Sequence, residues 1–296
     1  MKHSLKIIGI LLVMFLVTQL IGLAVIHVYS SHSNNIPYGM SPPENITPNT
    51  SFFSIIFALF FGIALMLILM KFKIELFLRL WFFFVVVIAI AITINSGIMS
   101  LPYSSLIALL VALPLAFIKV FRRTILVHNL TELMIYPGIA VIFVPLLNIW
   151  TVCLLLVLIS VYDIYAVWHA GFMQKMAKYQ IQKLKFFAGF FVPYIGKKER
   201  ALIAKAKSKS SKLKNQKIKV NLAILGGGDV VFPLILAGVV LVDFGILSAL
   251  IISLGATLAL SFLFYISKKG KFYPAMPFIT AGCFIALGVV YLLRII

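Results

Sequence analysis

The sequence predicts an all-α polytopic membrane protein with nine transmembrane helices. Of its 296 residues, 63% are hydrophobic and only 11% are charged, and the mean hydropathy is +1.14. About a quarter of the residues of a water-soluble domain are charged, and disordered chains have low hydrophobicity, so both classes are excluded. The apolar stretches are continuous rather than alternating, which favours helices over a β-barrel.

A helix needs about 20 mostly apolar residues to cross a bilayer, and nine stretches of this chain meet that requirement. They are 5–28, 52–70, 76–97, 101–118, 124–147, 149–169, 219–241, 244–266 and 275–295. The first has a basic start, but its apolar part is too long for a cleaved signal peptide. We therefore expect a six-helix part at 1–169, a basic cytoplasmic loop at 170–218 and a three-helix part at 219–296.

The positive charges predict how the chain lies in the cell membrane. There are 26 basic and 7 acidic residues, a net charge of +19. With nine spans, every basic residue except Arg294 falls on one side, and 14 of them lie in the loop at 170–219. The positive-inside rule places the N-terminus and this loop in the cytoplasm and the C-terminus outside. Topology explains the charge, so no nucleic-acid partner is expected.

The cytoplasmic loop has two parts of different composition. Residues 172–195 mix bases with aromatic side chains, among them Phe186, Phe187, Phe190, Phe191 and Tyr194. This mixture predicts an amphipathic segment that lies on the anionic inner leaflet of the bilayer. Residues 197–219 are rich in Lys and Ser, which is typical of a flexible segment.

The seven acidic residues divide into two groups. A solvated surface charge explains four of them: Glu44, Glu75, Glu199 and Asp243. The other three, Glu132, Asp163 and Asp229, lie within spans, where an ionisable residue is a functional hypothesis by default. Glu132 shares a helix face with His128 and Asn129, which favours a self-satisfied polar cluster. A role in the entry of substrate or water is the alternative.

Asp163 and Asp229 lie in successive spans on either side of the long loop. Asp163 is six residues before the end of its span, and Asp229 is about ten residues inside the next. At about 1.5 Å per residue, both are expected in the cytoplasmic half at one level. Two close carboxyls in a low-dielectric site resist ionising together and tend to share a proton. One can then activate water while the other polarises a peptide carbonyl, as in aspartic proteolysis.

Three short motifs accompany this pair. They are Tyr162-Asp163, Gly226-Gly227-Gly228-Asp229 and Pro274-Ala275-Met276. In this order on a nine-span plan, they resemble the Tyr-Asp, Gly-x-Gly-Asp and Pro-Ala-Leu motifs of the presenilin and signal peptide peptidase family of intramembrane aspartyl proteases. The resemblance covers nearly the whole chain, and the short length is similar to that of the archaeal members.

The resemblance implies a function for each motif. Asp163 and Asp229 would be the catalytic pair, and Pro274, Ala275 and Met276 would shape the substrate site. Met276 replaces the usual Leu, a change that conserves volume. The inferred orientation matches the presenilin branch, so the expected substrates are transmembrane helical proteins of presenilin-type orientation. No cofactor and no obligatory partner subunit are expected.

The residues themselves support a special backbone at these motifs. Gly226, Gly227 and Gly228 weaken a helix and allow another backbone to approach closely. Pro274 removes a backbone donor at the start of the last span. Tyr162 has two interpretations, a hydrogen bond near the pair or an amphipathic ring at the membrane interface. No His, Cys or Asp cluster has the spacing of metal ligands, so no metal is expected.

Two other functions fit part of the pattern. Prepilin and preflagellin peptidases also carry Gly-x-Gly-Asp, but they usually have Lys two residues after the Asp, where this chain has Val231. A proton- or cation-coupled transporter also uses paired carboxylates and broken helices. The absence of an obvious inverted repeat in this sequence argues against a transporter.

Overall fold

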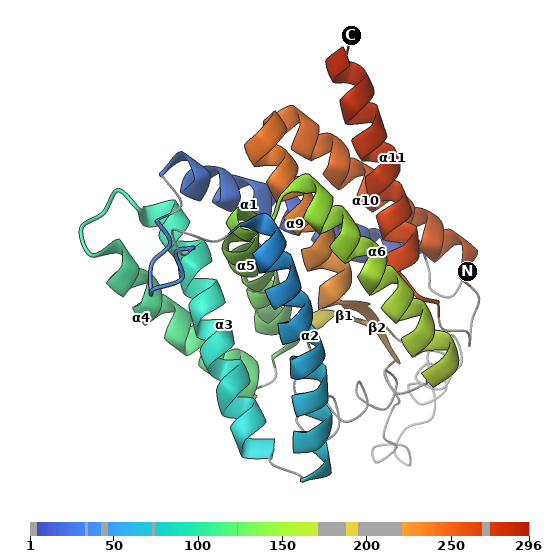
Figure 1. The fold of residues 1–296 in the computed structure, drawn as a ribbon. Coiled ribbons are helices and arrows are strands. Elements are labelled where there is room, and N and C mark those ends of the chain that lie inside the picture. The colour runs from blue at the N-terminus through green and yellow to red at the C-terminus, as the bar shows by residue number, and fades with distance from the viewer. Residues whose placement is uncertain are drawn as a thin grey trace, which may run out of the picture.

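The computed structural model describes residues 5–32, 35–42, 47–72, 75–122, 124–170, 188–194, 221–267 and 273–295. Among these residues, nine helices are long and apolar enough to cross a membrane, which confirms the predicted fold class. Figure 1 shows how they are arranged around a two-stranded sheet. The elements are α1 (Leu5–Ser31), α2 (Pro48–Lys71), α3 (Glu75–Ile98), α4 (Ser104–Phe117), η1 (Ile118–Arg122), α5 (Ile125–Phe143), η2 (Val144–Leu146), α6 (Ile149–Tyr165), η3 (Ala166–Ala170), β1 (Gly189–Tyr194), β2 (Asn221–Gly226), α9 (Gly227–Phe244), α10 (Ile246–Ile266) and α11 (Met276–Ile295).

The expected start of the seventh span is wrong. The sequence predicted a helix over 219–241, but Asn221–Gly226 forms the strand β2 and helix α9 begins at Gly227. The run Asn221–Gly226 is apolar enough to extend a helical pattern, and apolarity alone does not separate a short buried strand from a helix. Asp229 therefore lies in the first turn of α9 rather than ten residues inside a span.

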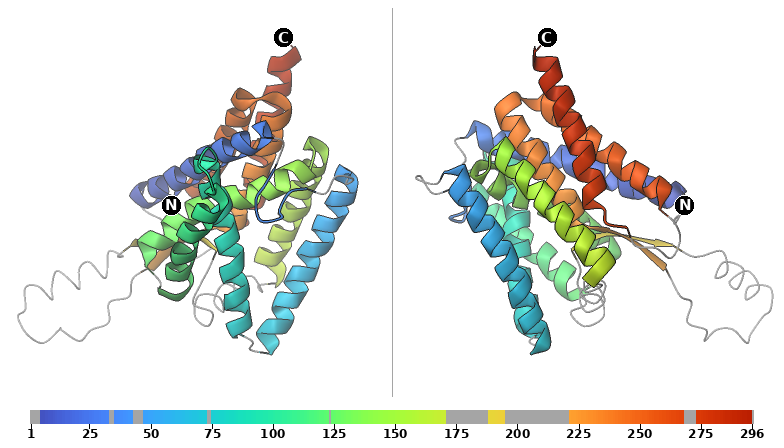
Figure 2. Two further views of the ribbon diagram at one scale, coloured as in Figure 1. Left: turned by 90° about the vertical axis from the view of Figure 1, so that its left-hand side faces the viewer. Right: turned by 45° about the vertical axis from the view of Figure 1, so that its right-hand side comes forward.

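The sheet also corrects the expectation for the cytoplasmic loop. Gly189–Tyr194 is not an amphipathic segment on the membrane surface but the strand β1, which pairs antiparallel with β2. Phe190 is fully buried in the protein core, and Val192 is also buried. The rest of 172–195, and 197–219, lie outside the described residues. The strands lie away from the C-terminal end of α11 (Figure 2).

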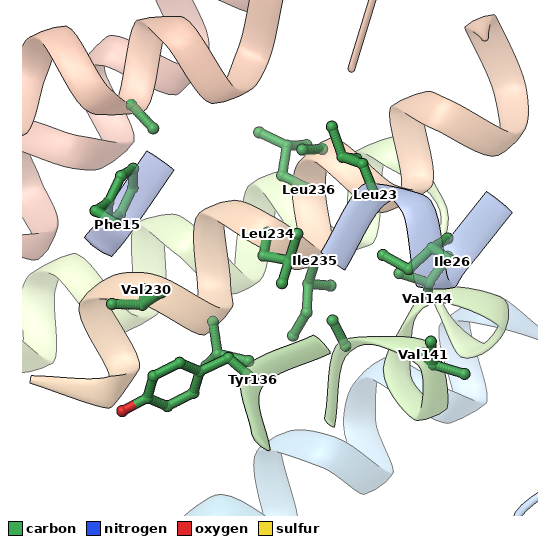
Figure 3. Packing of buried hydrophobic residues seen from close by; sticks show 14 of the residues in the cluster. Phe15, Leu23, Ile26, Tyr136, Val141, Val144, Val230, Leu234, Ile235 and Leu236 are labelled. Carbon is green, nitrogen blue, oxygen red and sulfur yellow. The ribbon is translucent and has the colours of Figure 1, made fainter. Parts of the chain in front are cut away.

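Helix α9 is the central helix of the bundle. In its 18-residue span, 61% of the residues are buried, against 6% in Pro48–Leu65 of α2. It packs against α1, α5, α6, α10 and α11. Figure 3 shows Leu234 and Ile235 of α9 packed with Leu23 and Ile26 of α1 and with Val141 of α5. The aspartate at the start of α9 is thus carried by the most enclosed helix.

Close helix contacts fix the helices next to α9. Helix α3 touches α5 at Gly138, where a Cβ atom would lie 2.0 Å from the Ala89 carbonyl oxygen. Helix α10 meets α11 at Gly255 and Gly282, where a Cβ on Gly255 would lie 2.7 Å from the Gly282 carbonyl oxygen. Small residues allow this close backbone approach in membrane bundles. Because a larger residue would clash at these glycine positions, the contacts determine the positions of α5 and α11.

Candidate active site

Asp229 lies where the sheet passes directly into a helix. Strand β2 ends at Gly226, which has an extended backbone (φ −64°, ψ 146°) and is the N-cap residue of α9. Asp229 is the third residue of the helix, and its carboxylate folds back over the N-cap. A Cβ on Gly226 would lie 3.2 Å from its Oδ2, and the backbone N–H of Gly226 faces the carboxylate. An acidic side chain at this position compensates free N–H groups of a first turn.

Asp163 is held by the start of another helix. It lies on the last turns of α6 and is 6% exposed. Its Oδ2 accepts a hydrogen bond of 3.0 Å from the backbone N–H of Met276, and the backbone N–H of Ala275 faces the same carboxylate. Met276 is the first residue of α11, so its N–H has no partner within the helix. The helix dipole also favours a negative charge at this end.

The chain before α11 is not helical, as the proline predicted. Residues 273–275 have no regular structure, Pro274 is buried and the Met276 side chain is 3% exposed. Pro277 is the second residue of α11, where a missing N–H costs nothing. The Pro274-Ala275-Met276 segment therefore presents backbone N–H groups, rather than side chains, to Asp163.

A pair of hydroxyl groups joins the same two helices one turn further along. The side chains of Ser160 on α6 and Thr280 on α11 are 2.8 Å apart, and both are buried. Ser160 is three residues before Asp163, and Thr280 is four residues after Met276. The hydroxyl contact therefore fixes the same two helix faces that bring Asp163 to Met276.

The structure brings Asp163 and Asp229 together. Helix α6 packs against α9, and the Asp163 carboxyl is near enough to Asp229 to interact with it electrostatically. Tyr162 is half-buried next to Asp163 on α6. Together these residues form one acidic site at the end of α6, the start of α9 and the start of α11, in which Asp163 is buried and Asp229 is half-buried.

The three glycines have different surroundings. A Cβ on Gly227 would lie 2.8 Å from both Cε1 and the hydroxyl oxygen of Tyr136. A Cβ on Gly228 would make only ordinary contacts, at 3.6 Å from the Phe232 ring, and Gly228 is exposed. Gly226 lies against the Asp229 carboxylate. One glycine is thus required by packing, and another opens the site to its surroundings.

A comparison with known protein families identifies the family of this chain. A family model described as "Signal-peptide peptidase, presenilin aspartyl protease" matches residues 12–295. The chain belongs to this family. It is therefore an aspartyl protease, and its nine apolar helices make it a multi-pass integral membrane protein.

Solved structures of this protease family share the fold. Two structures of "a presenilin family intramembrane aspartate protease", in C222 and P2 space groups, are each 18% identical to this chain. Their TM-scores are 0.64 and 0.63; they cover 97% and 98% of this chain, and this chain covers 99% of each. No curated protein matches the chain in sequence.

Sequence reasoning missed the buried contacts of three residues of this protease. Lys119 was counted with the loop bases, but it is 3% exposed and forms an ion pair with Glu132. Tyr136 covers Gly227, and no motif marked it. Gln19 is fully buried on α1, and its Nε2 donates a hydrogen bond of 3.0 Å to the carbonyl oxygen of Val230, directly after Asp229. A polar residue in the first span was the available signal for Gln19.

No cluster of metal ligands appears in the part of the protease that the structure describes. Among those residues, no three His, Cys, Asp or Glu side chains are grouped as a metal site would require. The acidic pair has backbone N–H groups as its close partners instead.

Proposed function

We propose that the protein hydrolyses peptide bonds within the transmembrane helices of membrane proteins, with Asp163 and Asp229 as the catalytic pair and water as the nucleophile. One observation carries the proposal. Two acids from different membrane-spanning helices lie in one site, Asp163 buried and Asp229 half-buried, and each faces backbone N–H at the start of a helix. This arrangement stabilises one negative charge on the pair more easily than two.

The pair supports general acid–base hydrolysis. With one proton shared between the carboxyls, the ionised oxygen takes a proton from water as the water oxygen bonds to the peptide carbon. The protonated carboxyl donates to the carbonyl oxygen, which becomes the hydroxyl of a tetrahedral intermediate. The nitrogen then receives a proton from the pair and leaves as an amine as the C–N bond breaks, while one hydroxyl of the intermediate returns its proton to the pair and the product carboxyl forms. The proton belongs to the pair rather than to one residue.

A substrate helix must unwind before its peptide bond reaches the pair. The described sheet has two strands, so β2 pairs with β1 along one edge and offers its other edge to an extended segment. Exposed Gly228, between β2 and Asp229, leaves space for a second backbone. Tyr162, Pro274, Ala275 and Met276 would border the bound segment. These features favour an unwound stretch of a transmembrane helix as the substrate.

Orientation and partners belong to the same proposal. The positive-inside distribution places the N-terminus and the loop at 170–219 in the cytoplasm, next to the anionic leaflet. The protease would then act on substrates of presenilin-type orientation, without obligatory subunits. Single cysteines at Ser41 and at Ser208, in a background without Cys153 and Cys283, test the orientation in intact cells. A membrane-impermeant thiol reagent should label the first and not the second.

The decisive experiment is cleavage in a defined membrane. The purified protein, reconstituted with a single-span substrate, should release fragments cut within the span. Asp163→Asn and Asp229→Asn should each lower the rate by about 10²–10⁴-fold. Asp243→Asn is the matched control, because Asp243 is exposed near the far end of α9. Normal cleavage by either dyad variant would refute the pair, and ion flux without any cleavage would favour a transporter.

A further inference from the structure

A buried ion pair lies outside the catalytic pair. Nζ of Lys119, in the π-helical turn η1, is 2.5 Å from Oε1 of Glu132 on α5, and both side chains are 1% exposed. Nδ1 of His128, one turn before Glu132, is 3.4 Å from the same Nζ. The π turn follows Pro114 in α4, and such turns are frequent at functional sites.

The free-energy cost of burying this ion pair requires an explanation. Removing two charges from water costs several kcal/mol per ion, and an apolar pair of similar volume is often as stable or more stable. Within a membrane span the cost is larger still. Lys119 is also enclosed by protein in the folded chain, so a solvated surface charge does not account for it. Stability alone therefore does not account for this cluster. The contacts that the cluster makes with the rest of the protein indicate its role.

Those contacts lead to strand β1. Nε2 of His128 is 2.7 Å from the carbonyl oxygen of Gly189, the first residue of β1. The His128 ring stacks on Phe191 with centroids 4.6 Å apart. Asn129 binds the backbone of Phe191 twice, through Nδ2 to its carbonyl oxygen (2.8 Å) and through Oδ1 from its N–H (3.0 Å). Helix α5 thus replaces a neighbouring strand along this edge of β1.

Strand β1 in turn fixes the start of α9. Gly189 pairs with Gly226 in the sheet register, and the N–H of Gly227 donates to the carbonyl oxygen of Ala188 (3.2 Å). Tyr136, two turns beyond His128 on the same face of α5, packs over Gly227 and meets Phe190 edge to face. Figure 3 shows Tyr136 beside the first turn of α9 near Val230. The path from the ion pair to Asp229 is therefore continuous.

The hydrogen bonds also assign the tautomer of His128. A carbonyl oxygen only accepts, so Nε2 facing Gly189 must carry a hydrogen. The Lys119 ammonium only donates, so Nδ1 facing it must be the acceptor. Lys119 and the Gly189 carbonyl therefore favour the same neutral form of His128, the form that can hold β1. Glu132 holds Lys119, and its Oε1 lies 3.6 Å from Nε2 of His128. A partner that fixes a histidine tautomer in this way is familiar from the outer shells of metal and catalytic sites.

We propose that Lys119, Glu132 and His128 form a positioning cluster that sets the Asp229 side of the dyad, with Lys119 acting through the tautomer of His128. The proposal rests on the proposed function, because it assumes that Asp229 is catalytic. It assigns the cluster no proton transfer to the substrate.

The test replaces both charges at once, so that neither is left buried alone. Lys119→Met/Glu132→Leu should fold, and it should retain Asn129 on β1. Its kcat should fall by about 10- to 100-fold with KM within about threefold, because geometry rather than substrate affinity is lost. A purely structural cluster predicts wild-type kcat for the folded protein, and that result would overturn the proposal.

A spectroscopic readout tests the tautomer directly. In ¹⁵N-histidine NMR spectra, His128 is identified among the five histidines by the signal lost in His128→Asn. The wild type should show a single Nε2–H form, and Lys119→Met/Glu132→Leu a mixture of both forms. An Nδ1–H form in the wild type, or an unchanged Nε2–H form in the double variant, would refute the role of Lys119.

The outcomes separate this inference from the proposed function. If Asp163→Asn and Asp229→Asn abolish cleavage while the double charge variant cleaves at the wild-type rate, the positioning cluster alone is wrong. If the aspartate variants cleave normally, the dyad is wrong whatever the charge variant does.

Discussion

The two halves of the dyad are held by different kinds of structure. Asp163 receives one backbone hydrogen bond from the start of α11, and a neutral hydroxyl pair joins its helix to α11. Asp229 stands at the end of a longer path that runs through α9, both strands, α5 and the buried ion pair. The first arrangement is local and uncharged, whereas the second is distributed and contains buried charges.

This difference determines where distant mutations should act. The position of Asp163 depends on a few atoms at one helix junction, so only substitutions close to it should matter. The position of Asp229 depends on residues as far along the chain as Lys119, so remote substitutions on α5 should reach it. The following predictions test each side with matched pairs of variants.

The largest effect is expected from one unpaired charge on the Asp229 side. Glu132→Leu leaves the Lys119 ammonium buried without its carboxylate, which should cost about 3–5 kcal/mol of unfolding free energy. The double variant Lys119→Met/Glu132→Leu should regain most of that loss. Denaturant unfolding in detergent, followed by tryptophan fluorescence, measures both. If the double variant is as unstable as the single one, the ion pair itself is stabilising and the estimate of its cost is wrong.

On the Asp163 side, a single substitution can remove the backbone hydrogen bond to the carboxylate. Met276→Pro deletes the N–H that Asp163 accepts, and proline is tolerated at the first position of a helix. A hydrogen bond to a charged group contributes about 1.5–3 kcal/mol, so kcat should fall roughly 10- to 150-fold relative to Met276→Ala. The alanine variant is the control, because it truncates the same buried side chain and keeps the N–H. Equal rates for the two variants would show that this hydrogen bond does not matter for cleavage.

The glycines test the packing of α5 against α9. Gly227→Ala would place its Cβ 2.8 Å from the Tyr136 ring, and overpacking of this kind costs about 1–3 kcal/mol. Gly228→Ala would meet only the Phe232 ring at 3.6 Å, so its unfolding free energy should change less. The loss for Gly227→Ala/Tyr136→Leu should be smaller than the sum of the single losses. Additive losses would mean that the clash lies elsewhere.

The sequence predicted most of the fold because hydrophobic length is a strong signal in membranes. Continuous apolar runs locate helices, and a strand in lipid must satisfy its backbone elsewhere. The same signal misplaced the start of α9, since Asn221–Gly226 is apolar but pairs with β1. That pairing depends on a segment 27 to 37 residues earlier, so no local pattern in the sequence reveals it.

The site was predictable only in part, for a related reason. Asp163 and Asp229 stand out because acids are rare in spans, and Glu132 was expected in a polar cluster. Lys119 is a base near a span end, like its neighbours Arg122 and Arg123. It was therefore interpreted as a loop charge, and its ion pair with Glu132 was not expected. In the sequence Tyr136 is an ordinary aromatic residue, and only the structure shows that it packs on Gly227. Rare residue types identify a site, whereas long-range partners require the fold.

The smallest effect is expected at the hydroxyl pair on the Asp163 side. Interhelical hydrogen bonds in membranes contribute about 0.6 kcal/mol on average and at most about 1.7 kcal/mol. Ser160→Ala/Thr280→Val removes both hydroxyls, so unfolding should change by less than about 1 kcal/mol. Because the pair aligns α6 with α11, kcat should still fall a few-fold. Thr257→Val is the control, since its hydroxyl bonds within its own helix α10. A larger loss of stability than for the control, with kcat unchanged, would mean that the pair holds the two helices together without positioning Asp163.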